Sequence, residues 1–150
     1  MRFFEDSKYY SLKKSTYINL RWIGIIGQLI SVYLVHFYFG FKFDFFLANL
    51  AIFFGVLSNL YLIFIYKKTQ LSDRLALLFL LFDIIQLTVL IYLTGGAKNP
   101  FIIFIIIPSI FASTNLGLKT NLLIVLITCI MIIFLTFYAS DLPYPLDGHF

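Results

Sequence analysis

The sequence predicts an all-α fold, a polytopic bundle of membrane-spanning helices. Of its 150 residues, 61% are hydrophobic and only 12% are charged, whereas a soluble domain carries about 25% charged residues. The mean hydropathy is +0.97, and a soluble domain of this size would leave about 30% of its unfolded surface exposed to water. The chain lacks the polar side chains to cover such a surface. The composition therefore excludes a disordered protein, a disulfide-rich secreted scaffold and a soluble enzyme core.

Charged and turn-forming residues divide the chain into five apolar stretches, each close to the 20 or so helical residues that cross a bilayer. The expected spans are residues 18–39, 45–66, 75–94, 101–116 and 122–140. Their connectors are short, so neighbouring helices run antiparallel. We expect a cytoplasmic N-terminal tail over residues 1–17 and a membrane domain over residues 18–150, in which the C-terminal end cuts off a sixth span.

The cationic residues predict how the bundle is oriented in the membrane. Nine of the eleven Lys and Arg residues fall on one side of the predicted spans, and only Lys42 and Lys98 fall on the other. The positive-inside rule places the N-terminus in the cytoplasm. Because these cations lie between hydrophobic segments and form no continuous stripe, we expect no nucleic-acid partner.

Asp83 lies near the middle of the third span, where a charged side chain costs about 2.5–3.5 kcal/mol. It is therefore expected to face the bundle interior and to be paired or protonated. Because Arg21 is expected to lie too near the inner interface to pair with it, we expect the neutral acid and predict that Asp83→Asn leaves insertion and folding intact. Gln86 follows three residues later on the same helix face, so the two predict one polar spot. This spot is either a proton-accepting or ligand-binding site, or a set of interhelical hydrogen bonds.

Three polar residues of the first span, Arg21, Gln28 and His36, fall within an arc of about 80° at 100° per residue. Gly24 and Gly27 lie beside them and predict close approach of another helix. Arg21 is expected to extend to the inner interface, away from the third-span carboxylate. His36, near the outer end, is either a ligand-binding imidazole or an interfacial residue without a role. The spacing of His, Cys and carboxylate residues predicts no metal site.

The connector between the third and fourth spans reads GGAKNPF, residues 95–101. Gly95 and Gly96 permit the positive φ of a tight reversal. Asn99 can cap the next helix, and Pro100 fits its first position. Read locally, the stretch is a turn. The alternative is that its amides and the Asn side chain, next to Phe101, hold the polar head of a flat lipophilic ligand.

Pro108 makes the fourth span irregular. It lacks the N–H of a helical hydrogen bond and crowds the carbonyl of Phe104, so the sequence predicts a kink there. A kinked helix beside a ligand-binding loop is suited to relay a conformational change.

The segment DIIQLTVLIYLTGGAKNPFIIFIIIPSIFAST resembles the membrane domain of the RegB/PrrB (ActS-like) family of redox-responsive sensor histidine kinases. In that family, a GGxxNPF heptapeptide between the third and fourth spans is the quinone-binding motif. Every fixed position is present here, as Gly95, Gly96, Asn99, Pro100 and Phe101. RWIGIIGQL in the first span and the LPYPL connector, which in the family leads to a sixth span, resemble the family as well.

The resemblance implies a multi-pass sensory domain of the bacterial inner membrane that senses respiratory redox state through bound quinone of the ubiquinone type. Asp83, Gln86 and His36 are expected as supporting polar residues of the quinone site. The implied output is control of autophosphorylation and of phosphotransfer to a response regulator, in a homodimer surrounded by membrane lipid. We expect no catalytic residue in this chain, because ATP would be used only by a kinase domain that is absent from it.

Two other functions remain open from the residues alone. The chain could be a fragment of a membrane transporter with Asp83 as its proton-coupling carboxylate. Transporters often carry internal repeats and paired broken helices, and neither is evident in the sequence. The other alternative is a small membrane-embedded assembly subunit that binds no ligand.

Overall fold

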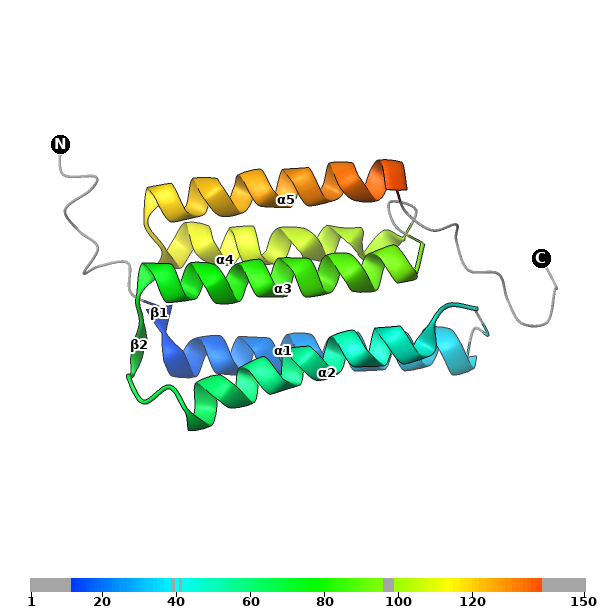
Figure 1. The fold of residues 1–150 in the computed structure, drawn as a ribbon, viewed down its shortest axis with the longest axis horizontal. Coiled ribbons are helices and arrows are strands. Elements are labelled where there is room, and N and C mark those ends of the chain that lie inside the picture. The colour runs from blue at the N-terminus through cyan, green and yellow to red at the C-terminus, as the bar shows by residue number, and fades with distance from the viewer. Residues whose placement is uncertain (1–11, 39, 41, 96–98, 139–150) are drawn as a thin grey trace.

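The computed structural model describes residues 12–38, 40, 42–95 and 99–138. Its described part is a bundle of helices, which confirms the predicted fold class (Figure 1). The α-helices are α1 (Lys14–Tyr33), α2 (Phe45–Phe64), α3 (Asp73–Leu93), α4 (Ile107–Asn115) and α5 (Leu118–Tyr138). A π-helical segment, Leu34–Tyr38, continues α1, and a 3₁₀ helix, Pro100–Ile106, leads into α4. Two short strands, β1 (Leu12–Lys13) and β2 (Gln70–Leu71), pair antiparallel.

Four helices in the described residues are long and apolar enough to cross a membrane. They are Lys14–Tyr38, Phe45–Phe64, Asp73–Leu93 and Leu118–Tyr138, and the segment Phe101–Asn115 is a shorter apolar helix. α1 and α5 begin four residues before the predicted spans, at Lys14 and Leu118. A membrane helix can begin in the headgroup region, where long cationic side chains reach water. Hydropathy alone therefore places the first residue of such a helix too late in the sequence. Parts of the predicted tail and the end of the predicted fifth span lie outside the described residues.

α3 occupies the centre of the bundle. It contacts α2 on one side and α4 and α5 on the other, while α1 packs against α2 (Figure 1). Leu80, Ile84 and Ile91 of α3 are at most 2% exposed and share a core with Ile124 and Leu135 of α5. α3 is therefore apolar on several faces, as expected of a helix with neighbours around it.

The two ends of the bundle differ in charge. β1 and β2 join the start of α1 to the loop before α3, and Lys13, Lys67, Lys68 and Lys119 belong to this end of the bundle. Lys42 lies in the loop between α1 and α2 at the opposite end. The predicted segregation of these cations is thus present in the fold. The side of the membrane that each end faces stays a prediction.

The irregularity predicted for the fourth span takes the form of a change in helix type. The chain is 3₁₀-helical up to Ile106, and Pro108 then stands in the first turn of α4. The missing N–H of proline costs nothing at that position, since the first N–H groups of an α-helix have no intrahelical acceptor. α4 is held against α5 by a hydrogen bond of 2.8 Å between the hydroxyls of Ser109 and Thr128.

Candidate functional site: a cavity between α1, α3 and α4

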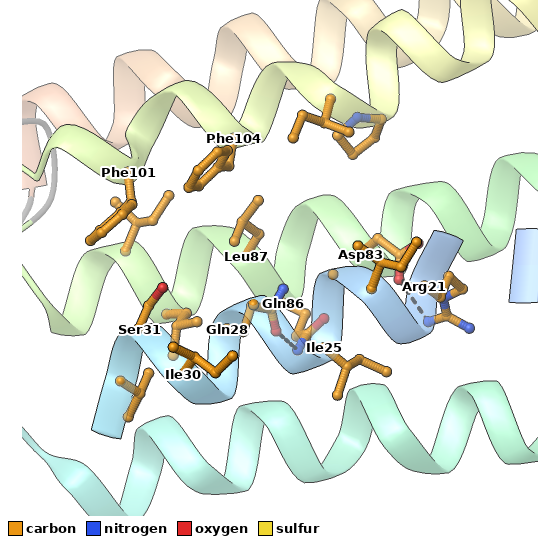
Figure 2. Close-up of a pocket in the computed structure, with 18 of the residues that line it drawn as sticks. Arg21, Ile25, Gln28, Ile30, Ser31, Asp83, Gln86, Leu87, Phe101 and Phe104 are labelled. Carbon is orange, nitrogen blue, oxygen red and sulfur yellow. Dashed lines mark hydrogen bonds and ion pairs between the residues drawn. The ribbon is translucent and has the colours of Figure 1, made fainter. Parts of the chain in front are cut away.

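A cavity of about 840 Å³ lies between α1, α3 and the segment that runs from Asn99 to Phe111. Figure 2 shows Leu87 of α3 with Phe101 and Phe104 lining it across from α1. The volume is typical of sites for small organic ligands, which measure about 300–1,000 Å³. Ile23 and Ile107, which line the cavity from α1 and α4, are 69% and 46% exposed. The cavity is therefore open between these two helices, on the side that lipid would surround.

An ion pair between Arg21 of α1 and Asp83 of α3 closes one end of the cavity (Figure 2). Arg21 donates from Nη2 and Nε to Asp83 Oδ1, at 2.6 and 3.1 Å. The Tyr17 hydroxyl donates to Asp83 Oδ2 at 2.6 Å, and Arg21 Nη2 also donates to Ser58 of α2. Three helices thus share one buried polar network in which Arg21 is 6% exposed.

This ion pair overturns the expectation that Arg21 extends to the inner interface. The guanidinium lies over the rings of Tyr17 and Phe79, with Cζ at 5.4 and 5.5 Å from the ring centroids. A buried cation is tolerated only with a compensating anion and further hydrogen bonds, and Asp83 supplies the anion. The position of Arg21 in the sequence does not indicate the rotation of α1 that turns its side chain toward α3.

A second bridge crosses from α3 to α1 farther along the cavity. Gln86 Nε2 donates to Gln28 Oε1 at 2.9 Å (Figure 2). Asp83 and Gln86 therefore both bond to α1 beside the same cavity, as the interhelical hydrogen-bond alternative expects. On its other side, Gln86 lies against Gly55 of α2, where an added Cβ would be 2.8 Å from Gln86 Nε2.

The glycines of α1 do not have the predicted role. No atom lies within 4 Å of the position that a Cβ would take on Gly24 or Gly27, and both residues line the cavity. Among the described residues, no other helix packs against these glycines, and the space beside them is empty. Their effect is to widen the cavity beside Gln28.

The described residues of the GGxxNPF motif lie at the other end of the cavity. Gly95 has φ 118°, and the Asn99 side chain caps the following helix by accepting from Phe101 N at 2.9 Å. Asn99 Nδ2 donates to the backbone oxygen and to the hydroxyl of Thr94, at 3.2 and 2.7 Å. Asn99 and Phe101 line the cavity. Gly96 and the side chain of Pro100 lie outside the described part of the structure.

His36 lies away from the cavity. Its ring stacks on Phe45 with centroids 4.2 Å apart, and it also contacts Phe37 and Phe43 edge-on. Its Nδ1 is buried without a hydrogen-bond partner among the described residues. Of the predicted supporting residues, the structure brings Asp83 and Gln86 to the cavity and does not bring His36 there.

Sequence reasoning left Tyr17 and Ser58 out of the site and gave Gln28 no partner. A signal for Tyr17 and Gln28 was present, because Tyr17, Arg21 and Gln28 are spaced by four and seven residues and so share one face of a helix. Ser58 carried no such signal, since α2 is apolar on most of its surface and a lone hydroxyl in it commonly bonds its own helix. Ser58 does so as well, donating to Gly55 O at 3.0 Å.

Comparison with known proteins gives two matches. The family model described as a PilS-like transmembrane domain matches residues 5–148. The protein named sensor histidine kinase RegB of Cereibacter sphaeroides is 34% identical over 125 residues, which cover 83% of this chain and 26% of that protein. The chain thus spans about a quarter of the length of this relative. No solved structure matches.

Proposed function

Because this chain belongs to the family of PilS-like transmembrane domains, we propose that it senses the redox state of the membrane by binding a quinone in the cavity between α1, α3 and α4. The chain is the membrane domain of a sensor kinase of the RegB type. The ligand would be a quinone of the ubiquinone type, and its binding would report the redox state of the membrane.

The observation that carries this proposal is the position of the motif in the cavity. Asn99 and Phe101 of the complete GGxxNPF sequence form part of the wall of a large apolar cavity that opens toward lipid. A quinone is a flat ring with an isoprenoid tail, so it needs apolar walls, a few hydrogen-bonding groups and lateral access from the bilayer. Phe101 and Phe104 are stacked with centroids 5.7 Å apart and offer such a wall.

The signalling part of the proposal extends to protein beyond this chain. Quinone occupancy would set autophosphorylation from ATP by a cytoplasmic kinase domain and phosphotransfer to a response regulator. The working unit would be a homodimer in the bacterial inner membrane, with the N-terminus in the cytoplasm. The family assignment favours this function over the transporter alternative, and the ion pair with Arg21 gives Asp83 a structural partner in place of a coupled proton.

Binding is tested with a photoreactive ubiquinone analogue added to the purified chain in phospholipid vesicles, in competition with unlabelled quinone. The blocking variant is Gly24→Phe, since its Cβ meets no atom within 4 Å and its ring would enter the cavity. The matched control is Ile26→Phe, because Ile26 lies on the same helix, is 52% exposed and does not line the cavity.

We expect saturable, competed labelling of the parent and of Ile26→Phe, and at least a tenfold loss of affinity in Gly24→Phe. Equal labelling of all three proteins, or labelling of the parent that unlabelled quinone does not reduce, would reject the cavity as a quinone site. Sensing is tested by joining this chain to the cytoplasmic part of the Cereibacter sphaeroides relative. Autophosphorylation of that fusion should respond to added quinone, and the Gly24→Phe fusion should not respond.

A further inference from the structure

The Gln28–Gln86 pair stands midway along the cavity, between the ion pair at one end and the GGxxNPF turn at the other (Figure 2). Gln86 Nε2 donates to Gln28 Oε1 at 2.9 Å. Within the described ranges, Gln28 Nε2 donates to no residue and Gln86 Oε1 accepts from none. A primary amide left with free hydrogen-bonding atoms on an apolar wall is unfavourable unless a partner arrives. The pair therefore presents one free donor and one free acceptor to the cavity.

The Asn99 side chain of the GGxxNPF motif, in contrast, makes its hydrogen bonds to neighbouring residues of the chain. Both polar groups of the Asn99 side chain are occupied, Nδ2 by Thr94 and Oδ1 by the backbone N–H of Phe101. A quinone carbonyl that accepted from Asn99 Nδ2 would have to break the contacts with Thr94. Gln28 Nε2 can donate to a ligand without losing any contact that the structure shows.

The third helix of this arrangement, α2, fixes the direction of Gln86. Gly55 is buried, and an added Cβ there would be 2.8 Å from Gln86 Nε2 and 3.2 Å from Gln86 Oε1. The Gln86 amide thus lies directly on the α2 backbone, which leaves it pointing to Gln28. Gly55 does not line the cavity, so it affects a ligand only through Gln86.

We propose that the Gln28–Gln86 pair holds one ring oxygen of the bound quinone, with Gln28 Nε2 as donor and Gly55 as a positioning residue. This inference rests on the proposed function, because it assumes that the cavity binds quinone. A quinone carbonyl accepts a hydrogen bond from Gln28 Nε2, whereas a quinol hydroxyl can also donate one to Gln86 Oε1. The two redox forms therefore make different hydrogen bonds with the same pair of residues. The ring lies beside Leu87 and Phe104, and the tail leaves through the opening between α1 and α4.

The test is infrared spectroscopy of ubiquinone bound to the purified chain in vesicles, with one ring carbonyl carrying carbon-13, together with competition for the photoreactive analogue. Gln28→Met keeps the length of the side chain and removes the amide. Gly55→Ala displaces Gln86 from outside the cavity. Ile26→Met is the control, since Ile26 lies on the same helix as Gln28, is 52% exposed and does not line the cavity.

In the parent and in Ile26→Met, we expect one carbonyl to absorb at lowered frequency because it accepts a hydrogen bond. Gln28→Met should abolish that lowering and weaken binding about tenfold, the equivalent of one hydrogen bond. Gly55→Ala should reduce the lowering while helix content stays at the parent level. Competed binding with the lowered frequency retained in Gln28→Met would overturn this inference and leave the proposed function standing. Absence of competed binding in the parent would overturn both.

Discussion

Removing one partner of the Arg21–Asp83 ion pair is the perturbation that tests the buried network most directly. In Asp83→Leu, the Arg21 guanidinium remains 6% exposed and loses the carboxylate that accepts from its Nε and Nη2. Breaking a buried ion pair on one side costs about 3–5 kcal/mol, because the remaining charge is uncompensated. Asp83→Asn keeps a hydrogen-bond acceptor but not the charge, so the structure reverses the expectation from sequence that Asn is tolerated here.

The opposite variant, Arg21→Met, should cost less than Asp83→Leu. A carboxyl group left alone can bind a proton and become neutral, whereas a guanidinium cannot lose its charge in a protein. In the double variant, both charges are gone and an apolar pair fills their space, which is often neutral for stability. The Tyr17 hydroxyl then lacks its acceptor, and this leaves a loss of about 1–3 kcal/mol.

The measurement is the free energy of unfolding of the four proteins in mixed micelles, from SDS titration followed by helical circular dichroism. The double variant should be more stable than Asp83→Leu, so the coupling between the two sites is large and favourable in the parent. Strictly additive losses, or an Asp83→Leu protein as stable as the parent, would refute the assignment of a buried ion pair.

Two other predictions concern topology and the turn. Cys129 is the single cysteine of the sequence, so the labelling uses a Cys129→Ala background. In it, Lys68→Cys and Lys42→Cys should react with a membrane-impermeant thiol reagent from opposite sides of oriented vesicles, and reaction of both from the same side would contradict the predicted topology. Asn99→Ala should lose about 1 kcal/mol from the cap that Phe101 N uses and more from the two contacts with Thr94. Asn99→Asp keeps the cap but places a carboxylate oxygen near Thr94 O, which lies 3.2 Å from Nδ2 in the parent. This variant should therefore have a lower free energy of unfolding than the parent, and an unchanged value would contradict the hydrogen bonds between Asn99 and Thr94.

Local features of the fold could be predicted from the sequence because their causes lie within a few residues. The apolar lengths between charged residues predict the helices, and Gly95 with Asn99 predicts the turn and its cap, which the structure confirms. The predicted first residues of α1 and α5 were wrong by four residues, about one helical turn. Their first residues, Lys14 and Leu118, lie where the chain is no longer required to be apolar.

Which residues meet inside the bundle was decided only by the tertiary structure. The pairing of Arg21 with Asp83, the pairing of Gln28 with Gln86 and the separation of His36 from both depend on how α1 is rotated against α3. In a soluble protein, an apolar stripe would indicate that rotation. In a membrane, lipid is as apolar as the helix interface, so the sequence of each helix marks its inner face only weakly. Packing and a few polar contacts set the rotation, and with it the cavity.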